Sequence, residues 1–195
     1  MLLNTRRLLL RPVVTGDAEL LAALDSDPAV MRFVSGGAPT ALRTVTEWVI
    51  PRMQEQQREY GTGMWTAFEH GDRRFAGWVQ LRTPRHSRAD ELELSYRFRR
   101  EVWGRGLVTE AAAALIGATF DRNPATRIFA STQVAHTASR AVLMRLGMRL
   151  AAAADARVLT DPEADVEYEL LRGHWLATRS RHSAGHLTAQ ADMTA

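Results

Sequence analysis

The 195-residue sequence contains no cysteine, no lysine and no apolar run long enough to cross a membrane. Without cysteine there are no disulfides, thiolate metal ligands or cysteine nucleophiles, and the composition fits a reducing compartment. A membrane-spanning helix would need about 18 consecutive apolar residues. Residues 1–14 carry arginines within an apolar stretch and no small-residue cleavage site, so they predict a strand rather than a signal peptide. We therefore expect a cytoplasmic protein.

Arginine supplies all 25 of the strongly basic side chains, and the net charge is +3 with a sequence pI near 10.1. Acidic residues are interspersed among these arginines, which argues against a nucleic-acid-binding protein. A protein that contacts RNA through surface arginines stays the weakest alternative. A P-loop needs a lysine to bind nucleotide phosphates, so that class of nucleotide hydrolase is excluded. The histidines show no metal-ligand spacing, and no metal site is expected.

Length and composition predict one domain at residues 1–176 and a mobile C-terminal tail at 177–195. Hydrophobic residues make up 46% and charged residues 24% of the chain, as in ordinary globular proteins with their own core. Hydrophobic periodicity fades after Leu176. Strands and helices mix along the chain, so the expected class is α/β or α+β.

Periodicity and turn residues predict the order of the elements. Strands are expected at 5–14, 63–70, 75–82, 91–98 and 127–134, with a closing pair at 148–154 and 165–172. Helices are expected from Thr15, at 41–59, over the apolar stretch that ends near 120, and at 137–147. Pro51 should kink or split the second helix, because proline removes a backbone N–H and clashes with the preceding turn.

Gly104 and Gly106 lie just before a strongly helical stretch. The first N–H groups of a helix lack intrahelical partners, and the helix dipole adds partial positive charge there. Glycine lets a ligand approach the backbone closely, so this junction is suited to a phosphate or pyrophosphate, with Arg105 as a further contact. A tight turn entering a buried helix is the plain alternative. The motif is no dinucleotide fingerprint, because G-x-G-x-x-G is absent.

The segment 96–112, YRFRREVWGRGLVTEAA, resembles the acyl-CoA-binding segment of the GCN5-related N-acetyltransferases (GNAT), in particular the RimJ/RimL-like branch of ribosomal-protein N-terminal acetyltransferases. The matching positions are Trp103, Gly104, Arg105, Gly106, Thr109, Glu110 and Ala111. HTASRAVLMRLGM at 136–148 is similar to the second family signature. TRRLLLRPV at 5–13 and DVEYELLRGHW at 165–175 are similar to the opening and closing strands. The resemblance spans roughly Thr5 to Trp175.

This resemblance implies a mixed, mostly antiparallel sheet that is splayed at its centre, with helices on both faces and acyl-CoA in the gap. The end of the strand expected at 91–98 should offer backbone groups to the pantetheine amides. The turn at 102–107 should receive the pyrophosphate. The cofactor-binding residues implied are Tyr96, Arg97, Phe98, Val102, Trp103, Gly104, Arg105, Gly106, Leu107, His136, Ser139 and Arg140.

Three residues are the catalytic candidates. The resemblance places Ser139 near the thioester sulfur, where a hydroxyl can protonate the leaving thiolate; helix capping is its alternative role. Tyr168 on the closing strand is a rival acid, or a packed core residue. Glu93 is the candidate base for the amine, and strand alternation puts it on one face with Glu91 and Ser95. A solvated strand face is the alternative for Glu93.

Three positions depart from the family pattern. His136 stands where asparagine is usual, and a histidine there is either structural or a base. Met148 replaces a phenylalanine, which is a tolerable apolar exchange. Glu101 stands where glutamine or arginine is common, and its charge is unhelpful near a pyrophosphate unless it faces solvent.

We therefore expect an acyl-CoA-dependent N-acetyltransferase in which an amine attacks acetyl-CoA directly within a ternary complex. A protein N-terminal amine, an amino sugar, an amino acid and a polyamine all stay open as acceptors, and the resemblance favours the first. A CoA-binding regulatory module without turnover is the rival. The stretch 25–37 is expected to be a substrate-side loop, walled by Trp48 and Trp65. A homodimer is a guess from the family.

Overall fold

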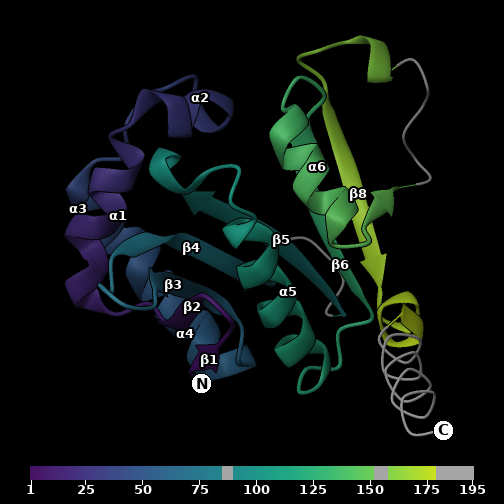
Figure 1. Cartoon of the computed structure of the whole chain (residues 1–195), viewed down its shortest axis with the longest axis horizontal. Coiled ribbons are helices and arrows are strands. Elements are labelled where there is room, and N and C mark those ends of the chain that lie inside the picture. The colour runs from purple at the N-terminus through teal and green to yellow at the C-terminus, as the bar shows by residue number, and fades with distance from the viewer. Residues whose placement is uncertain (85–89, 152–157, 179–195) are drawn as a thin grey trace, which may run out of the picture.

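The computed structural model describes residues 1–84, 90–151 and 158–178. Its centre is an eight-stranded sheet in the order β1-β2-β3-β4-β5-β6-β8-β7 (Figure 1). All pairings are antiparallel except the parallel pair β5–β6. The strands are β1 (Leu3–Asn4), β2 (Leu8–Pro12), β3 (Gly63–Glu69), β4 (Phe75–Arg82), β5 (Glu91–Phe98), β6 (Arg127–Gln133), β7 (Arg149–Leu150) and β8 (Asp165–Leu171). The predicted mixed, mostly antiparallel sheet is confirmed.

The helices lie between these strands. They are α1 (Ala18–Asp25), α2 (Pro28–Ser35), α3 (Leu42–Thr44), α4 (Ile50–Tyr60), α5 (Leu107–Phe120) and α6 (Thr137–Arg145). Short 3-10 turns occur at Thr15–Asp17, Arg100–Val102 and Val158–Thr160, and a further helical segment occupies 172–178. The predicted domain boundary at 176 falls inside that segment, and residues 179–195 lie outside the described part of the chain. No helix within the described ranges is long and apolar enough to span a membrane.

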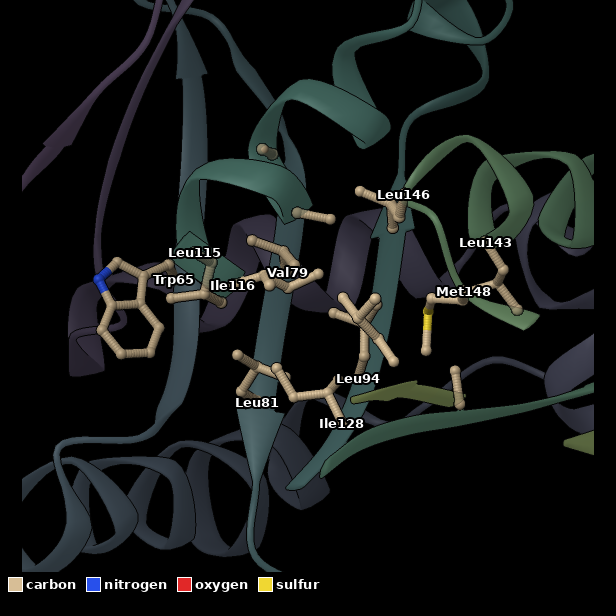
Figure 2. Close-up of a cluster of buried hydrophobic side chains, with 14 of the residues drawn as sticks. Trp65, Val79, Leu81, Leu94, Leu115, Ile116, Ile128, Leu143, Leu146 and Met148 are labelled. Carbon is tan, nitrogen blue, oxygen red and sulfur yellow. The ribbon is translucent and has the colours of Figure 1, made fainter. Parts of the chain in front are cut away.

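Helices cover both faces of the sheet. On one face, α5 and α6 enclose a core that includes Leu94, Leu115 and Leu143 (Figure 2). On the other face, α1 and α4 pack with Trp78 and other residues of the first strands in a second cluster. α5 can lie flat on the sheet because its sheet-facing side alternates small alanines with leucine and isoleucine.

The sheet splays between β5 and β6. These strands pair only through Glu91–Glu93 and Arg127–Phe129, at the beginning of each strand. Beyond Glu93, β5 keeps its hydrogen bonds to β4, and β6 keeps its own to β8. The two strands therefore diverge toward their carboxyl ends, as Figure 1 shows. Backbone groups that face the gap beyond Glu93 have no partner in the β5–β6 ladder.

Close approach of β4 to the end of β5 depends on Gly77. This residue has φ +151°, and a Cβ there would lie 2.3 Å from the Arg97 carbonyl oxygen and 2.6 Å from the Phe98 Cα. The register of the β3–β4 pair shifts beside it, between Ala67 and Phe68. Glycine at this point thus fixes the position of the β5 end, where the sheet opens.

The expectation of a loop at 25–37 is wrong. Asp27 accepts a hydrogen bond from the Ala29 N–H, Pro28 occupies the first turn, and Gly36 ends the helix in the left-handed conformation. This combination of N-cap, N-terminal proline and C-terminal glycine forms α2. The glycine and proline residues that indicated a loop are thus the residues that begin and end the helix.

Several other boundaries differ in detail. The expected strand at 5–14 is shorter, because β2 covers only Leu8–Pro12, and the two-residue β1 (Leu3–Asn4) precedes it across a turn. The helix at 41–59 is interrupted as predicted, by a π-helical turn at Val45–Val49 immediately before Pro51 enters the first turn of α4. The closing pair is confirmed as β7 and β8, although 152–154 lie outside the described residues.

Candidate active site

The turn before α5 has the features of an anion cradle. Gly104 and Gly106 both have φ +73°, and no described side chain caps the first amides of α5. A Cβ at Gly104 would meet nothing within 4 Å, so ligand space lies open beside it. The hydroxyl of Thr109, in the first turn of α5, is buried without a hydrogen-bond partner among the described residues. These groups fit a phosphate-bearing ligand.

The residues around this turn divide into anchors and exposed groups. Val102 and Leu107 are buried and hold the turn to the core. Trp103 is exposed, and its indole N–H donates to the Phe98 carbonyl oxygen at 2.8 Å. The Arg105 guanidinium pairs with Glu69 at 2.5 Å. Glu101, whose charge would be unhelpful inside the cradle, is exposed and pairs with Arg99.

Glu110 ties the first strands to the first turn of α5. Its carboxylate accepts hydrogen bonds from the Thr5 hydroxyl at 2.6 Å and from the N–H and Nε of Arg7 at 2.8 and 2.7 Å. Arg7 also donates to the Arg105 carbonyl oxygen, within the glycine turn. Burial raises the pKa of Glu110, but the hydrogen bonds from Thr5 and Arg7 outweigh it and lower the pKa overall. The opening segment at 5–13 and the glycine-containing segment at 96–112 thus meet at the Glu110 carboxylate.

Tyr96 and Ser139 join the two walls of the splay. The Tyr96 hydroxyl lies 3.0 Å from Ser139 Oγ and 3.2 Å from the Ser139 carbonyl oxygen. Tyr96 is on β5, past the last residue that pairs with β6, and Ser139 is the third residue of α6. Burial raises the pKa of Tyr96 to about 12, although the hydrogen bond to Ser139 lowers it slightly. Ser139 is not the N-cap of α6, since His136 holds that position.

Arg140 and Tyr168 form a separate contact beneath α6. The Arg140 Nε donates to the Tyr168 hydroxyl at 3.1 Å, and its Nη1 donates to the Val134 carbonyl oxygen at 3.1 Å. Tyr168 is only 4% exposed and packs in the core on the α5–α6 face. The structure therefore separates the two candidate acids: Ser139 borders the gap, and Tyr168 lies in the core.

Glu93 lies on the opposite face of β5. Its side chain pairs across the strands with Arg82 at 2.5 Å. The burial pattern of β5 confirms that Glu91, Glu93 and Ser95 share one face. Carboxylates on this face are engaged by arginines: Arg127 contacts Glu91, Glu167 and Glu169, and Arg97 pairs with Asp25 of α1 at 2.6 Å.

His136 contacts α2. Its ring stacks on that of Phe33 with a centroid distance of 4.2 Å and an interplanar angle of 15°. The Arg32 guanidinium lies 5.1 Å from the Phe33 ring centroid. Burial lowers the pKa of His136, and the positive charge of Arg32 lowers it further. The stacking contact and the lowered pKa both fit a structural role for His136.

A groove of about 710 Å³ runs along the α5–α6 face from the first turn of α5. Its lining includes Thr109, Ala113, Arg145, Arg149, His174 and Trp175. The Trp175 indole nitrogen is buried and has no partner among the described residues. Two cations and two unsatisfied polar atoms thus line one concave surface next to the anion cradle. No three His, Asp or Glu side chains in the described ranges gather into a group that could hold a metal.

Comparison with known proteins identifies the family. A family model described as an acetyltransferase (GNAT) domain matches residues 7–149. This chain belongs to the GNAT acetyltransferase family. It is an acyl-CoA-dependent N-acyltransferase with the GNAT fold, and the superfamily predicted from the sequence is confirmed.

Individual relatives support this GNAT assignment. The chain is 29% identical to the FsC-acetyl coenzyme A-N(2)-transacetylase of Aspergillus fumigatus, over 92% of this chain and 82% of that protein. An acetyltransferase structure from Agrobacterium tumefaciens superimposes with a TM-score of 0.71 at 25% identity, over 87% of this chain and 94% of the other. RimL, the ribosomal L7/L12 alpha-N-protein acetyltransferase in complex with coenzyme A, superimposes with a TM-score of 0.71 at 18% identity, covering 88% and 98% of the two chains.

Within this GNAT domain, sequence reasoning missed two contacts and misplaced one tryptophan. Tyr96 was expected to act through its backbone, yet its hydroxyl reaches Ser139. Phe33 was assigned to a loop, yet it packs on His136. Trp65 was expected to wall the substrate region, but it is 1% exposed in the core, whereas Trp48 is 71% exposed beside α4. Neither of the two contacts has a sequence signal, since each joins residues that are far apart in the chain.

Proposed function

We propose that this GNAT enzyme moves an acetyl group from acetyl-CoA to a primary amine by direct attack, and that the acceptor nitrogen is an α-amine. The observation that carries the proposal is the splay of β5 from β6 beside an uncapped helix N-terminus. Unpaired strand amides can bind the pantetheine arm, and the α5 amides can bind a pyrophosphate. When bound, acetyl-CoA supplies the acetyl group as a thioester.

The cofactor contacts proposed are those of the family. The turn from Val102 to Leu107 binds the pyrophosphate through the amides of its second half, because the Val102 and Trp103 N–H groups already donate within the preceding 3-10 turn. The Thr109 hydroxyl adds a donor. Backbone groups of Tyr96, Arg97 and Phe98 contact the pantetheine. The nucleotide end then lies in the groove that Arg145 and Arg149 line, where their charges suit a phosphate.

Ser139 is the proposed proton donor to the thiolate. Its position beside the gap supports this role, whereas the Tyr168 hydroxyl is buried and already accepts from Arg140. Glu93 is the proposed acceptor of the amine proton, directly or through water. His136 and Arg140 support the loop and helix beside the cofactor through their contacts with Phe33 and Val134.

The ion pair between Arg82 and Glu93 favours an α-amine as the acetyl acceptor. Arg82 already engages Glu93, so an incoming ammonium group must compete with a guanidinium for the same carboxylate. An α-amine has a pKa of about 8 and is partly neutral near pH 7.5, whereas a lysine-type amine with a pKa of about 10.4 is almost fully charged. The names of two relatives, an alpha-N-protein acetyltransferase and an N(2)-transacetylase, fit this choice. A peptide and a small molecule are both possible carriers of such an amine.

Thiol release from acetyl-CoA in the presence of an amine panel tests the proposed function. The panel contains peptides with free N-termini, amino acids, amino sugars and polyamines. We expect turnover with α-amines and weak turnover with the polyamines. Calorimetric binding of coenzyme A without thiol release on any amine would instead indicate a CoA-binding module without turnover, and absence of binding would contradict the whole proposal.

Amino-acid substitutions and a truncated substrate test the roles proposed for Ser139 and for the turn before α5. Ser139→Ala should lower kcat about 100-fold and leave coenzyme A affinity nearly unchanged, as expected for loss of a general acid. Thr137→Ala removes an exposed hydroxyl from the same helix turn and should behave as the wild type. Acetyl-pantetheine, which lacks the pyrophosphate, should have a much higher KM than acetyl-CoA. Equal KM values would refute the role of the α5 turn.

A further inference from the structure

The Tyr96–Ser139 hydrogen bond is a polar side-chain contact that spans the gap from β5 to α6. Tyr96 lies three residues beyond Glu93, the last β5 residue that pairs with β6. Its ring packs against the core on the α5–α6 face, and only its hydroxyl reaches Ser139. The phenol therefore contributes something that a phenylalanine of the same shape would lack.

The two hydroxyls can share their protons in two ways. If the Ser139 hydroxyl donates to the phenol oxygen, the serine proton is directed away from the gap. If Tyr96 donates to Ser139 Oγ, the serine proton is free to turn toward a ligand in the gap. Ser139 Oγ, at 3.0 Å, lies nearer to the phenol oxygen than the Ser139 carbonyl oxygen does at 3.2 Å, which favours donation to Oγ. The burial that raises the pKa of Tyr96 to about 12 keeps the phenol protonated, so it remains a donor throughout the working pH range.

We propose that Tyr96 is a positioning residue that holds Ser139 Oγ at the gap with the serine proton free for the departing sulfur. This inference rests on the proposed function of Ser139 as the proton donor. It adds a role for a side chain that no motif assigned, and it explains why the walls of the splay are joined by a hydrogen bond between hydroxyls.

The reaction that this arrangement assists is balanced in atoms and charge. The amine nitrogen forms a bond to the thioester carbon with its lone pair, and the carbon–sulfur bond breaks with its electron pair on sulfur. Sulfur takes the Ser139 proton, and Ser139 regains a proton from water. The proton that nitrogen loses passes to Glu93, directly or through water, and from there to solvent, so the hydroxyl pair is unchanged after each cycle. Tyr96 keeps its own proton throughout and acts only through Ser139.

Tyr96→Phe tests this inference, because it removes the hydroxyl and keeps the ring. The full-length protein is assayed with acetyl-CoA and the best amine of the panel. We expect kcat to fall about tenfold, the effect of losing one hydrogen bond that orients the donor, while the KM for acetyl-CoA changes less than about twofold. Tyr60→Phe, at the exposed end of α4, is the matched control and should behave as the wild type.

A double-mutant cycle separates positioning from a structural role. In a Ser139→Ala background, Tyr96→Phe should lower kcat by less than about twofold further, because the oxygen that it orients is gone. Ser139→Thr, which keeps a hydroxyl, should restore sensitivity to Tyr96→Phe. The same tenfold loss in both backgrounds would mean that Tyr96 acts independently of Ser139, and the inference would fail.

Other outcomes are equally informative. If the hydrogen bond were a strap that must open for acetyl-CoA, Tyr96→Phe would raise coenzyme A affinity and leave kcat unchanged, which would overturn the positioning role. An active wild type with an equally active Tyr96→Phe variant would reject this inference alone. A wild type that releases no thiol with any amine would reject the proposed function itself, and the positioning role with it.

Discussion

Phe33 of α2 stacks on His136 at the start of α6, with ring centroids 4.2 Å apart. Helix α2 follows α1, which packs on the first strands, whereas α6 follows β6 on the far side of the splay. The stack therefore joins two parts of the fold that the sheet itself allows to separate. In Figure 1, α2 lies next to the beginning of α6 at the open end of the sheet. The substitution of histidine for the usual asparagine gives α2 an aromatic partner.

Acidification should weaken this contact. Burial, and then the charge of Arg32, lower the pKa of His136 below its usual 6.5. A histidine whose pKa is lower in the folded state takes up a proton on unfolding, so its stabilisation is complete above pH 6.5 and is lost as the pH falls through the folded value. We expect the urea midpoint to fall more between pH 7.5 and about 5 for the wild type than for His136→Phe, which keeps a ring but cannot ionise. Equal pH dependence in the two proteins would contradict this account.

The strand, turn and helix from 91 to 120 could be predicted because every local signal agrees there. β5 alternates acidic and apolar residues, Gly104 and Gly106 supply left-handed backbone, and an alanine-rich stretch follows. Helix α2 could not be predicted in the same way. It is only eight residues long, and the proline and glycine that begin and end it are also the residues typical of a loop.

The candidate site was predictable only as far as local motifs reach. The glycine turn and Ser139 belong to motifs, and the Tyr96 backbone was assigned with them. The Tyr96–Ser139 and Phe33–His136 contacts join residues 43 and 103 positions apart, and nothing in a single sequence encodes such pairings. The engagement of Glu93 by Arg82 depends on strand register, which one sequence specifies only loosely.

Gly77→Ala should destabilise the protein and displace the end of β5. The new Cβ would lie 2.3 Å from the Arg97 carbonyl oxygen, and φ +151° is unfavourable for alanine. We expect the free energy of unfolding to fall by roughly 3 kcal/mol and coenzyme A affinity to fall with it, because Arg97 and Phe98 move. Gly71→Ala is the matched control: φ is +93°, but a Cβ meets nothing within 4 Å, so the cost should be about 1 kcal/mol. Equal losses of stability in the two variants would show that the positive φ alone, and not the contact with β5, destabilises the protein.

Glu110→Gln should loosen the junction between the first strands and α5. The carboxylate accepts three hydrogen bonds from Thr5 and Arg7, and an amide cannot replace the charge-assisted ones. Chemical unfolding should report a loss of about 2 kcal/mol at pH 7. Because the pKa of Glu110 is lowered in the folded state, this difference should be present above about pH 4.3 and shrink as the pH falls below it. Glu101→Gln, at an exposed carboxylate, should cause no measurable change, and an equal effect of both substitutions would contradict the assignment.

Glu93→Gln should impair transfer mainly at low pH. If Glu93 takes the proton of the amine, its loss matters while the acceptor is an ammonium and matters little once the amine is neutral, above its pKa of about 8. We expect kcat/KM for an α-amine to fall roughly 30-fold at pH 6.5 and less than threefold at pH 9. Glu91→Gln is the matched control, because Glu91 lies two residues earlier on the same face and is also held by an arginine, Arg127. A loss that is the same at both pH values would mean that Glu93 positions the acceptor instead, since positioning does not depend on the protonation of the amine.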